Sequence, residues 1–248
     1  MNWLLLNSGS CDAAFNMALD EALLENAARL GAPVLRFYGW TQPAATFGYF
    51  QKFSEVAAAT HLRPLIRRPT GGGIVPHDAD WTYSAIFPPG HEWHSLKAEE
   101  SYRRIHDWLR LALAELKIET ELAACCKKLT PVCRSRGDET HSEKRLLTSS
   151  PTSACFTGHE KFDLLWHGKK IAGAAQRRNK LGLLIQGSVQ PPPVPLPRDA
   201  FHDALRLVAE KMFGVSWSEF LPDAELQRHA EKMAAEKFSQ ACYNQKRL

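Results

Sequence analysis

The 248-residue sequence contains few cysteines and lacks the spacing that structural zinc sites require. It has six cysteines and no CxxC pair, whereas structural zinc ligands normally come in such close pairs. We therefore expect no metal site at Cys125, Cys126, Cys133 and His141. The cysteines are expected to be reduced thiols rather than a disulfide framework.

Long apolar runs and strong charge are also missing. No segment approaches the ~18 apolar residues of a membrane span, and the apolar start of the chain is too short for a signal peptide and lacks a basic lead. The net charge is only +4, without a Lys/Arg stripe that alternates with aromatics. We expect a soluble, cytoplasmic protein with neither a nucleic-acid nor a membrane partner.

The sequence also lacks a GxxxxGK[ST] phosphate loop, a GxGxxG fingerprint and an HExxH zinc helix. A glycine triplet stands out instead, in the segment RRPTGGGIVPHD at 67–78. Glycine accepts positive φ and lets backbone amides approach a ligand closely. Beside Arg67 and Arg68, such amides suit a carboxylate, a phosphate or a thioester carbonyl. By itself, a glycine-rich turn is more often a structural turn than a binding site. If this segment is a binding site, the predicted substrate-binding residues in it are Arg68, Thr70, Gly71, Gly72 and Gly73.

His77 and Asp78 follow the glycines closely enough to share a pocket wall. His77 is a candidate proton shuttle near neutral pH, and Asp78 a candidate to cap a helix or to orient the histidine. Taken alone, each residue is more often structural. We include both among the predicted substrate-binding residues.

Cys155 and Lys170 are the candidate catalytic pair. A lone cysteine is more often a small buried apolar residue, but a reactive thiolate needs exposure and a nearby cation, which Lys170 would supply. Strand alternation places Lys170, Ala172 and Ala174 on one face and Gly173 on the other, so that small side chains leave a slot for an acyl group. Alternatively, Lys170 is an edge-strand lysine that discourages aggregation.

The hydrophobic patterns predict an α+β fold in which a mixed or antiparallel sheet is flanked by helices. A helix that begins after the N-cap Asp12 and ends at Gly31 is expected, as is a polar segment over 127–153 that is either a lid or a plain surface loop. Two closing helices form a short helical C-terminus. The predicted strands are 3–6, 34–38, 45–50, 64–67, 81–84 and a meander over 162–166, 170–178 and 183–189. The other predicted helices are 54–61, 98–117, 198–213 and 223–238. The helix over 98–117 is expected to bury a stripe formed by Tyr102, Ile105, Leu109, Leu113 and Leu116.

The glycine segment and the segment GKKIAGAAQRR at 168–178 together resemble the biotin/lipoate protein ligase superfamily. The segments FNMALDEAL at 15–23 and RFYGW at 36–40 are similar to its lipoate branch. The resemblance covers about three quarters of the chain. It implies a ligase-like catalytic domain over 1–197, with 198–248 as a helical extension packed on the same domain.

Within this superfamily the sequence is most similar to the cysteine-dependent octanoyltransferase class. Cys155 falls at the nucleophile of that class, and Lys170 at the superfamily lysine. The resemblance implies transfer of an octanoyl group from acyl carrier protein, through a Cys155 thioester, to a lysine of a lipoyl domain of the glycine-cleavage H protein or E2 type. Gly173 and Ala174 are implied to contact the substrate, and no cofactor is required.

Two other enzyme activities remain open at this stage, beside a binding module that keeps the fold without the chemistry and escorts lipoyl domains, against which the intact Lys170 and Cys155 argue. The intact triplet Gly71–Gly73 is typical of lipoate–protein ligases, which form a lipoyl-adenylate with Mg-ATP. A lipoyl amidotransferase would carry the acyl group between lipoyl domains with similar residues. The sequence also leaves open the choice between octanoyl and lipoyl groups, the preferred acceptor, the general base and the oligomeric state.

Overall fold

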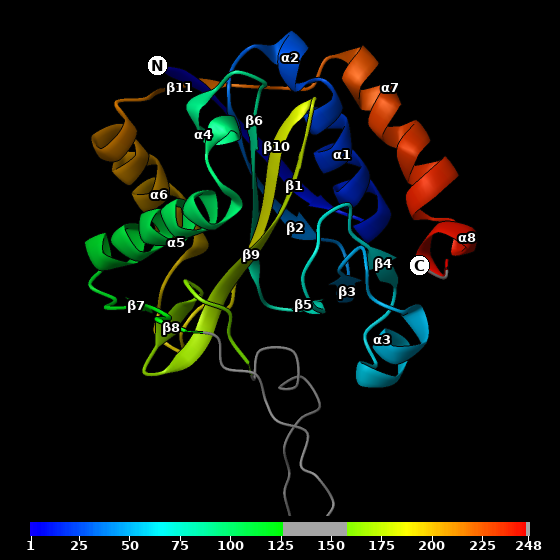
Figure 1. Cartoon of the computed structure of the whole chain (residues 1–248), viewed down its shortest axis with the longest axis horizontal. Coiled ribbons are helices and arrows are strands. Elements are labelled where there is room, and N and C mark those ends of the chain that lie inside the picture. The colour runs from blue at the N-terminus through cyan, green and yellow to red at the C-terminus, as the bar shows by residue number, and fades with distance from the viewer. Residues whose placement is uncertain (126–157, 247–248) are drawn as a thin grey trace, which may run out of the picture.

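The computed structural model describes residues 1–125 and 158–246. Within them the chain forms one large mixed sheet, a small three-stranded sheet and flanking helices (Figure 1). The strands are β1 (Asn2–Cys11), β2 (Val34–Trp40), β3 (Ala44–Phe47), β4 (Leu65–Arg67), β5 (Val75–His77), β6 (Trp81–Phe87), β7 (Glu121–Leu122), β8 (Leu164–Trp166), β9 (Lys169–Asn179), β10 (Gly182–Val189) and β11 (Ser216–Glu219). The helices are α1 (Ala13–Glu25), α2 (Ala27–Leu30), α3 (Phe53–Ala59), α4 (Glu92–Ser95), α5 (Ala98–Glu115), α6 (Arg198–Phe213), α7 (Ala224–Met233), a π-helical turn (Ala234–Phe238) and α8 (Ala241–Asn244).

The large sheet has the order β11-β1-β2-β6-β10-β9-β8-β7. β1 pairs in parallel with β2 and β11, and the other neighbours are antiparallel. The small sheet, β4-β3-β5, holds the two sides of the glycine turn, because β4 leads into the turn and β5 leaves it. The predicted α+β class and the predicted meander, formed by β8, β9 and β10, are confirmed.

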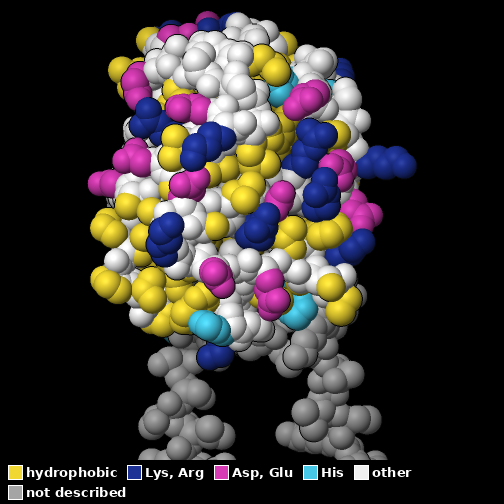
Figure 2. Space-filling model, turned by 90° about the vertical axis from the view of Figure 1, so that its left-hand side faces the viewer, with side chains coloured by type: hydrophobic (Ala, Val, Ile, Leu, Met, Phe, Trp, Pro, Cys, Tyr) yellow, Lys and Arg dark blue, Asp and Glu magenta, His cyan; other side chains and the backbone are white. Residues whose placement is uncertain are grey.

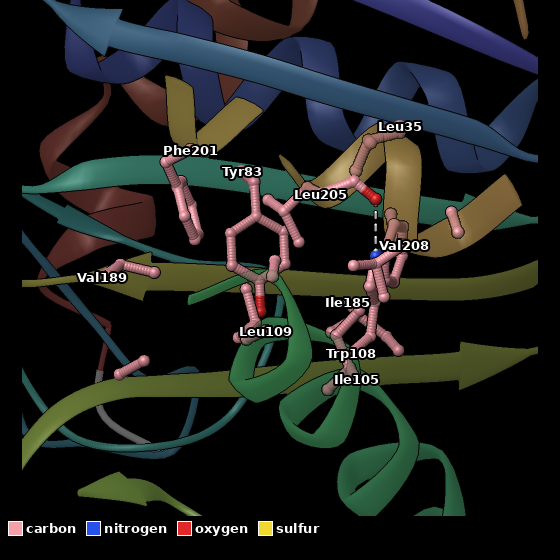
Figure 3. Close-up of a cluster of buried hydrophobic side chains, with 14 of the residues drawn as sticks. Leu35, Tyr83, Ile105, Trp108, Leu109, Ile185, Val189, Phe201, Leu205 and Val208 are labelled. Atoms are coloured by element: carbon pink, nitrogen blue, oxygen red, sulfur yellow. Dashed lines mark hydrogen bonds between the residues drawn. The ribbon is translucent and has the colours of Figure 1, made fainter. Parts of the chain in front are cut away.

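The main hydrophobic core lies between the large sheet and helices α5 and α6. Ile105, Leu109 and Leu113 of the predicted α5 stripe are buried there, with Ile105 and Leu109 facing Ile185 of β10. Tyr102 of the stripe is half-buried. The Trp108 indole donates a hydrogen bond of 2.8 Å to the backbone carbonyl of Leu205 in α6, the dashed line in Figure 3. Burial of this apolar surface joins the C-terminal segment 198–213 to the sheet.

Helices α1 and α7 cover the opposite face of the sheet (Figure 1). The predicted N-cap is confirmed, since the Asp12 carboxylate accepts a 2.9 Å hydrogen bond from the Phe15 amide. Leu19 and Leu23 bury their side chains against the sheet. Gly31, with a φ of 67°, ends α2 in the left-handed conformation that favours glycine.

The region after residue 197 differs from the predicted pair of helices in an added strand and in the form of the last helix. Residues 216–219 form β11, which adds an edge strand to the large sheet beside β1. The predicted last helix is a short α7 followed by the π-helical turn. The domain boundary at residue 197 stays a prediction.

The outer surface over α5 and α6 carries interspersed charges of both signs among hydrophobic side chains, without one large field of a single sign (Figure 2). Within residues 1–125 and 158–246, no helix combines the length and the apolar character that a bilayer crossing needs. The predicted lid or loop over 127–153 lies outside the described residues.

Candidate functional site

A cavity of about 130 Å³ lies between the glycine turn and strand β9. Its wall combines apolar side chains, among them Met17, Ile74 and Val75, with two cationic side chains. The structure brings together seven of the predicted site residues along this wall: Arg68, Gly72, Gly73, His77, Lys170, Gly173 and Ala174. A wider groove shares Gly72 and Tyr102 with the cavity and opens outward from it.

Lys170 is held at the cavity wall by Asp163, a residue that sequence reasoning missed. The Lys170 ammonium lies 2.7 Å from the Asp163 carboxylate, and the two side chains are 18% and 0% exposed. The same carboxylate accepts hydrogen bonds from the Tyr102 hydroxyl at 2.5 Å and the Glu160 amide at 2.7 Å. These contacts fix the ammonium in position, so Lys170 is more than an aggregation-blocking edge lysine.

The predicted strand alternation at Lys170 is wrong, because a β-bulge interrupts it. Lys170 is the partner of Leu165 and Ala172 is the partner of Leu164, so the intervening Ile171 is an extra residue. Lys170 therefore shares a face with Gly173 rather than with Ala172. A Cβ at position 173 would lie 2.7 Å from the Lys170 Cε atom, so only glycine leaves room for the lysine.

The glycine turn is fixed by Arg68 from inside the fold. The Arg68 guanidinium donates to the carbonyls of Gly71 and Gly73 and to the Thr46 hydroxyl. Burial lowers the pKa of Arg68 to about 10, which leaves it cationic at neutral pH. Gly72 has a φ of 89°, which confirms that the turn uses the conformational freedom of glycine.

Arg67 does not face a ligand. Its side chain is fully buried and donates to backbone carbonyls of two distant segments, Tyr49 and Gln51 on one side and the region of α8 on the other. Burial lowers the pKa of Arg67. Its role is to connect the strand before the glycine turn with α8.

Thr70 lies behind the cavity rather than in its wall. Its hydroxyl donates a 2.7 Å hydrogen bond to Gln186, whose amide in turn donates to Asp20. Asp20 forms a fully buried ion pair of 2.7 Å with Arg36. Arg36 therefore belongs to the interior of the fold. Gly71 contributes its carbonyl to Arg68 and borders the outer groove.

The partner of His77 is Asp80 and not Asp78. The His77 Nδ1 atom lies 2.9 Å from Asp80 Oδ2, whereas Asp78 is exposed and caps no helix. The Nε2 atom of His77 lies 2.8 Å from the Thr46 hydroxyl. A spacing of three residues across a tight turn could have suggested Asp80, but the adjacent Asp78 was equally compatible with the sequence.

The predicted nucleophile Cys155 lies outside the described residues, as do Cys126, Cys133 and His141 of the rejected zinc set. Cys155 precedes Glu160, a residue of the cavity wall, by five positions in the sequence. Among the residues that the structure describes, no group of three or more His, Cys, Asp or Glu side chains could hold a metal ion.

Comparison with known proteins gives relatives in sequence and in structure. The chain is 36% identical over 192 residues to octanoyltransferase LipM of Geobacillus kaustophilus and 35% identical to that of Bacillus subtilis, in each case over 75% of this chain and 64% of the relative. It therefore spans about 64% of the length of these curated relatives.

Two solved structures share the fold at 19% sequence identity. Protein Ta0514 of Thermoplasma acidophilum with bound lipoic acid superposes with a TM-score of 0.75, over 99% of this chain and 100% of that chain. Lipoate-protein ligase A bound with ATP superposes with a TM-score of 0.74, over 99% of both chains. The family model of the lipoyl protein ligase A/B catalytic domain matches residues 12–213. The chain belongs to this lipoyl protein ligase A/B family.

Proposed function

We propose that this chain is an acyltransferase of protein lipoylation, which transfers an octanoyl group from acyl carrier protein to a lysine of a lipoyl domain. The single observation that carries the proposal is the cavity, in which a lysine held by a carboxylate faces a glycine turn across apolar side chains. The octanoyltransferase LipM relatives support the octanoyl group as the cargo.

The cavity wall suits an acyl thioester. Met17, Ile74 and Val75 provide apolar surface for an alkyl chain, and burial of such a chain is favourable by about 0.8 kcal/mol per methylene. Lys170 and Arg68 supply positive charge at the polar end. Developing negative charge on a carbonyl oxygen is stabilised by such fixed positive groups.

In the proposed reaction Cys155 is the nucleophile. Its thiolate attacks the thioester carbonyl of the octanoyl donor, a new C–S bond forms, and the bond from the carbonyl carbon to the carrier sulfur breaks. The carrier leaves as a thiolate, which takes up the proton that Cys155 lost when its own thiolate formed. The amine of the acceptor lysine then attacks the octanoyl-Cys155 carbonyl, which forms the amide and releases the cysteine thiol. The Lys170 ammonium would favour the thiolate form of Cys155, and no cofactor is consumed because conversion of a thioester into an amide is downhill.

The acceptor is proposed to be a lipoyl domain of the H protein or E2 type. One structural neighbour is a bipartite lipoate protein ligase of Thermoplasma acidophilum, described together with its E2 lipoyl domain. The Mg-ATP-dependent ligase and the lipoyl amidotransferase are the alternative outcomes of the test below.

The test is the intact mass of the purified protein after mixing with octanoyl-acyl carrier protein in the absence of ATP. We expect one octanoyl adduct on the wild type and none on the Cys155→Ser variant, followed by octanoyl transfer to an added apo H protein. Transfer that requires free octanoate, ATP and Mg²⁺, without an adduct, would identify a ligase. Octanoyl uptake only from an octanoylated lipoyl domain would identify an amidotransferase.

A further inference from the structure

A chain of hydrogen bonds runs from the glycine turn to a buried carboxylate along one side of the cavity. The Arg68 guanidinium donates to the Thr46 hydroxyl at 3.1 Å, the Thr46 hydroxyl lies 2.8 Å from His77 Nε2, and His77 Nδ1 lies 2.9 Å from Asp80 Oδ2. All four side chains are buried, and three of them line the cavity. The fourth, Asp80, lies behind His77.

The contacts of Asp80 settle the direction of these hydrogen bonds when His77 is neutral. Asp80 Oδ2 is an acceptor for the hydroxyls of Thr82 and Ser188 and for His77 Nδ1, so the histidine proton lies on Nδ1. Nε2 is then an acceptor, and the Thr46 hydroxyl donates to it. Trp40 stacks on the imidazole with a centroid distance of 3.8 Å and holds the ring in this orientation.

The Thr46 oxygen retains one acceptor position. A hydroxyl has one proton and two lone pairs; here the proton goes to His77 and one lone pair to Arg68. The remaining lone pair is available to an N–H or ammonium group in the cavity. This arrangement can therefore accept a proton from a substrate and pass it to His77.

A second cavity of about 200 Å³ borders the opposite side of the histidine. His77, Asp80, Trp40 and Arg198 are part of its wall. Asp80 Oδ1 is buried without a hydrogen-bond partner among residues 1–125 and 158–246, and the one ion-pair partner that these residues give Asp80 is His77. A buried carboxylate is stabilised by a paired cation, so Asp80 is placed to stabilise the imidazolium that forms when His77 accepts a proton.

We propose that Thr46 and His77 form the proton acceptor for the incoming lysine, with Asp80 as the positioning residue that holds the histidine tautomer. This inference rests on the proposed function and assigns the base that the acyl-transfer step needs. An N–H bond of the acceptor ammonium breaks, its proton passes to the Thr46 oxygen, and the Thr46 proton passes to His77 Nε2.

The remaining steps balance the reaction. The neutral amine attacks the acyl carbonyl, the C–N bond forms and the bond from carbon to the leaving group breaks. The second proton of the attacking nitrogen goes to the leaving sulfur, which departs as a thiol. The imidazolium then loses a proton to bulk solvent, so one proton per turnover is released and His77 is neutral again.

A dependence on pH follows from the charges around His77. The imidazole must be neutral to accept a proton, so the transfer rate is expected to rise with pH. Among the residues that the structure describes, the titratable and charged groups that line either cavity with this ring, or contact it, lie on several elements. They are Asp78, Asp80, Arg68, Tyr38, Arg198, Tyr102, Glu160 and Lys170.

The experiment isolates the transfer step. Octanoyl-enzyme is prepared from octanoyl-acyl carrier protein, freed of donor and mixed with an apo lipoyl domain, and the mass of the lipoyl domain is followed between about pH 5 and pH 9, a range that spans the ordinary histidine pKa. For His77→Gln we expect normal acyl uptake but transfer slower by about 10²-fold, without the rise with pH. The exposed His61→Gln is the matched control and should behave as the wild type.

A second pair of variants separates the loss of the proton acceptor formed by Thr46 and His77 from a loss of folding. Thr46→Ser keeps the hydroxyl and should transfer like the wild type, whereas Thr46→Val keeps the shape and should be as slow as His77→Gln. Wild-type rate and pH dependence in either His77→Gln or Thr46→Val would overturn the inference, as would an equal loss of uptake and transfer in both. Failure of the proposed function is seen separately, as the absence of uptake and transfer in the wild type.

Discussion

Gly173→Ala is expected to impair acyl transfer severely while it changes stability little. The added Cβ would lie 2.7 Å from the Lys170 Cε atom, 2.8 Å from its Nζ atom and 3.2 Å from the Asp163 carboxylate. Carbon atoms in contact are normally separated by about 3.5–4.0 Å, so the lysine head must shift by about 1 Å. That shift breaks the 2.7 Å contact between Lys170 and Asp163.

The size of the stability change follows from how deeply the Lys170–Asp163 ion pair is buried. An exposed ion pair contributes about 0.2–1 kcal/mol, and the loss of one partner from a buried pair costs about 3–5 kcal/mol. Here the lysine side chain is 18% exposed and the aspartate 0% exposed, and the displaced lysine keeps its charge and can reach water. We therefore expect the broken ion pair to lower the free energy of unfolding by about 1–2 kcal/mol. Replacement of glycine by alanine within a strand recovers about 0.5–1 kcal/mol, so the net loss of stability is about 0–1.5 kcal/mol.

The effect on catalysis should be much larger. A displacement of about 1 Å at a reacting group can reduce the rate by about 10²-fold, and Lys170 faces the proposed acyl site. The assay is single-turnover octanoyl uptake, combined with urea unfolding of the wild type, Gly173→Ala, Lys170→Met and the double variant. Since Lys170→Met removes the ammonium, we expect Gly173→Ala to be neutral or stabilising in that background. Equal destabilisation in both backgrounds, or undiminished uptake by Gly173→Ala, would refute the reasoning.

Two further predictions concern stability. Asp20→Asn leaves the Arg36 guanidinium fully buried without its carboxylate, so urea unfolding should show a loss of about 3–5 kcal/mol in the free energy of unfolding. The control is Glu99→Gln, which removes an exposed ion pair and should cost less than about 1 kcal/mol. Equal losses in the two variants would contradict the importance of the buried Asp20–Arg36 pair. Burial lowers the pKa of His106 from 6.5 to about 4. As the pH drops, the histidine of the unfolded chain is therefore protonated before that of the folded chain. The free energy of unfolding should fall between about pH 6.5 and pH 4, by up to about 3 kcal/mol. His106→Phe should flatten this part of the stability–pH curve, and an unchanged slope would show that His106 is not its source.

Much of the fold could be predicted because it depends on local signals. The cap at Asp12, the stripe of α5 and the meander follow from side-chain periodicity and turn residues, which act over a few positions. The cavity residues Arg68, Gly72 and Lys170 were also found in the sequence, since each lies in a dense motif. Strand pairing then brings these three residues together in the wall of the same cavity.

The features that escaped prediction depend on contacts between distant segments. The bulge at Ile171 is set by pairing with β8, so simple alternation placed Lys170 on the wrong face. Strand β11 exists through its pairing with β1, and its four residues carry no strong strand pattern of their own. Similarly, Asp163 becomes a site residue only where β8 and α5 meet.

The contacts of Arg67 have a consequence for protein synthesis. Its guanidinium donates to the carbonyls of Tyr243, Asn244 and Lys246, and its backbone amide donates to the Asn244 side chain. While a ribosome makes the chain, the strand that leads into the glycine turn emerges about 180 residues before these partners. The turn is therefore fully anchored only after residue 246 has left the exit tunnel, so a nascent chain holds an unfinished cavity wall until that point.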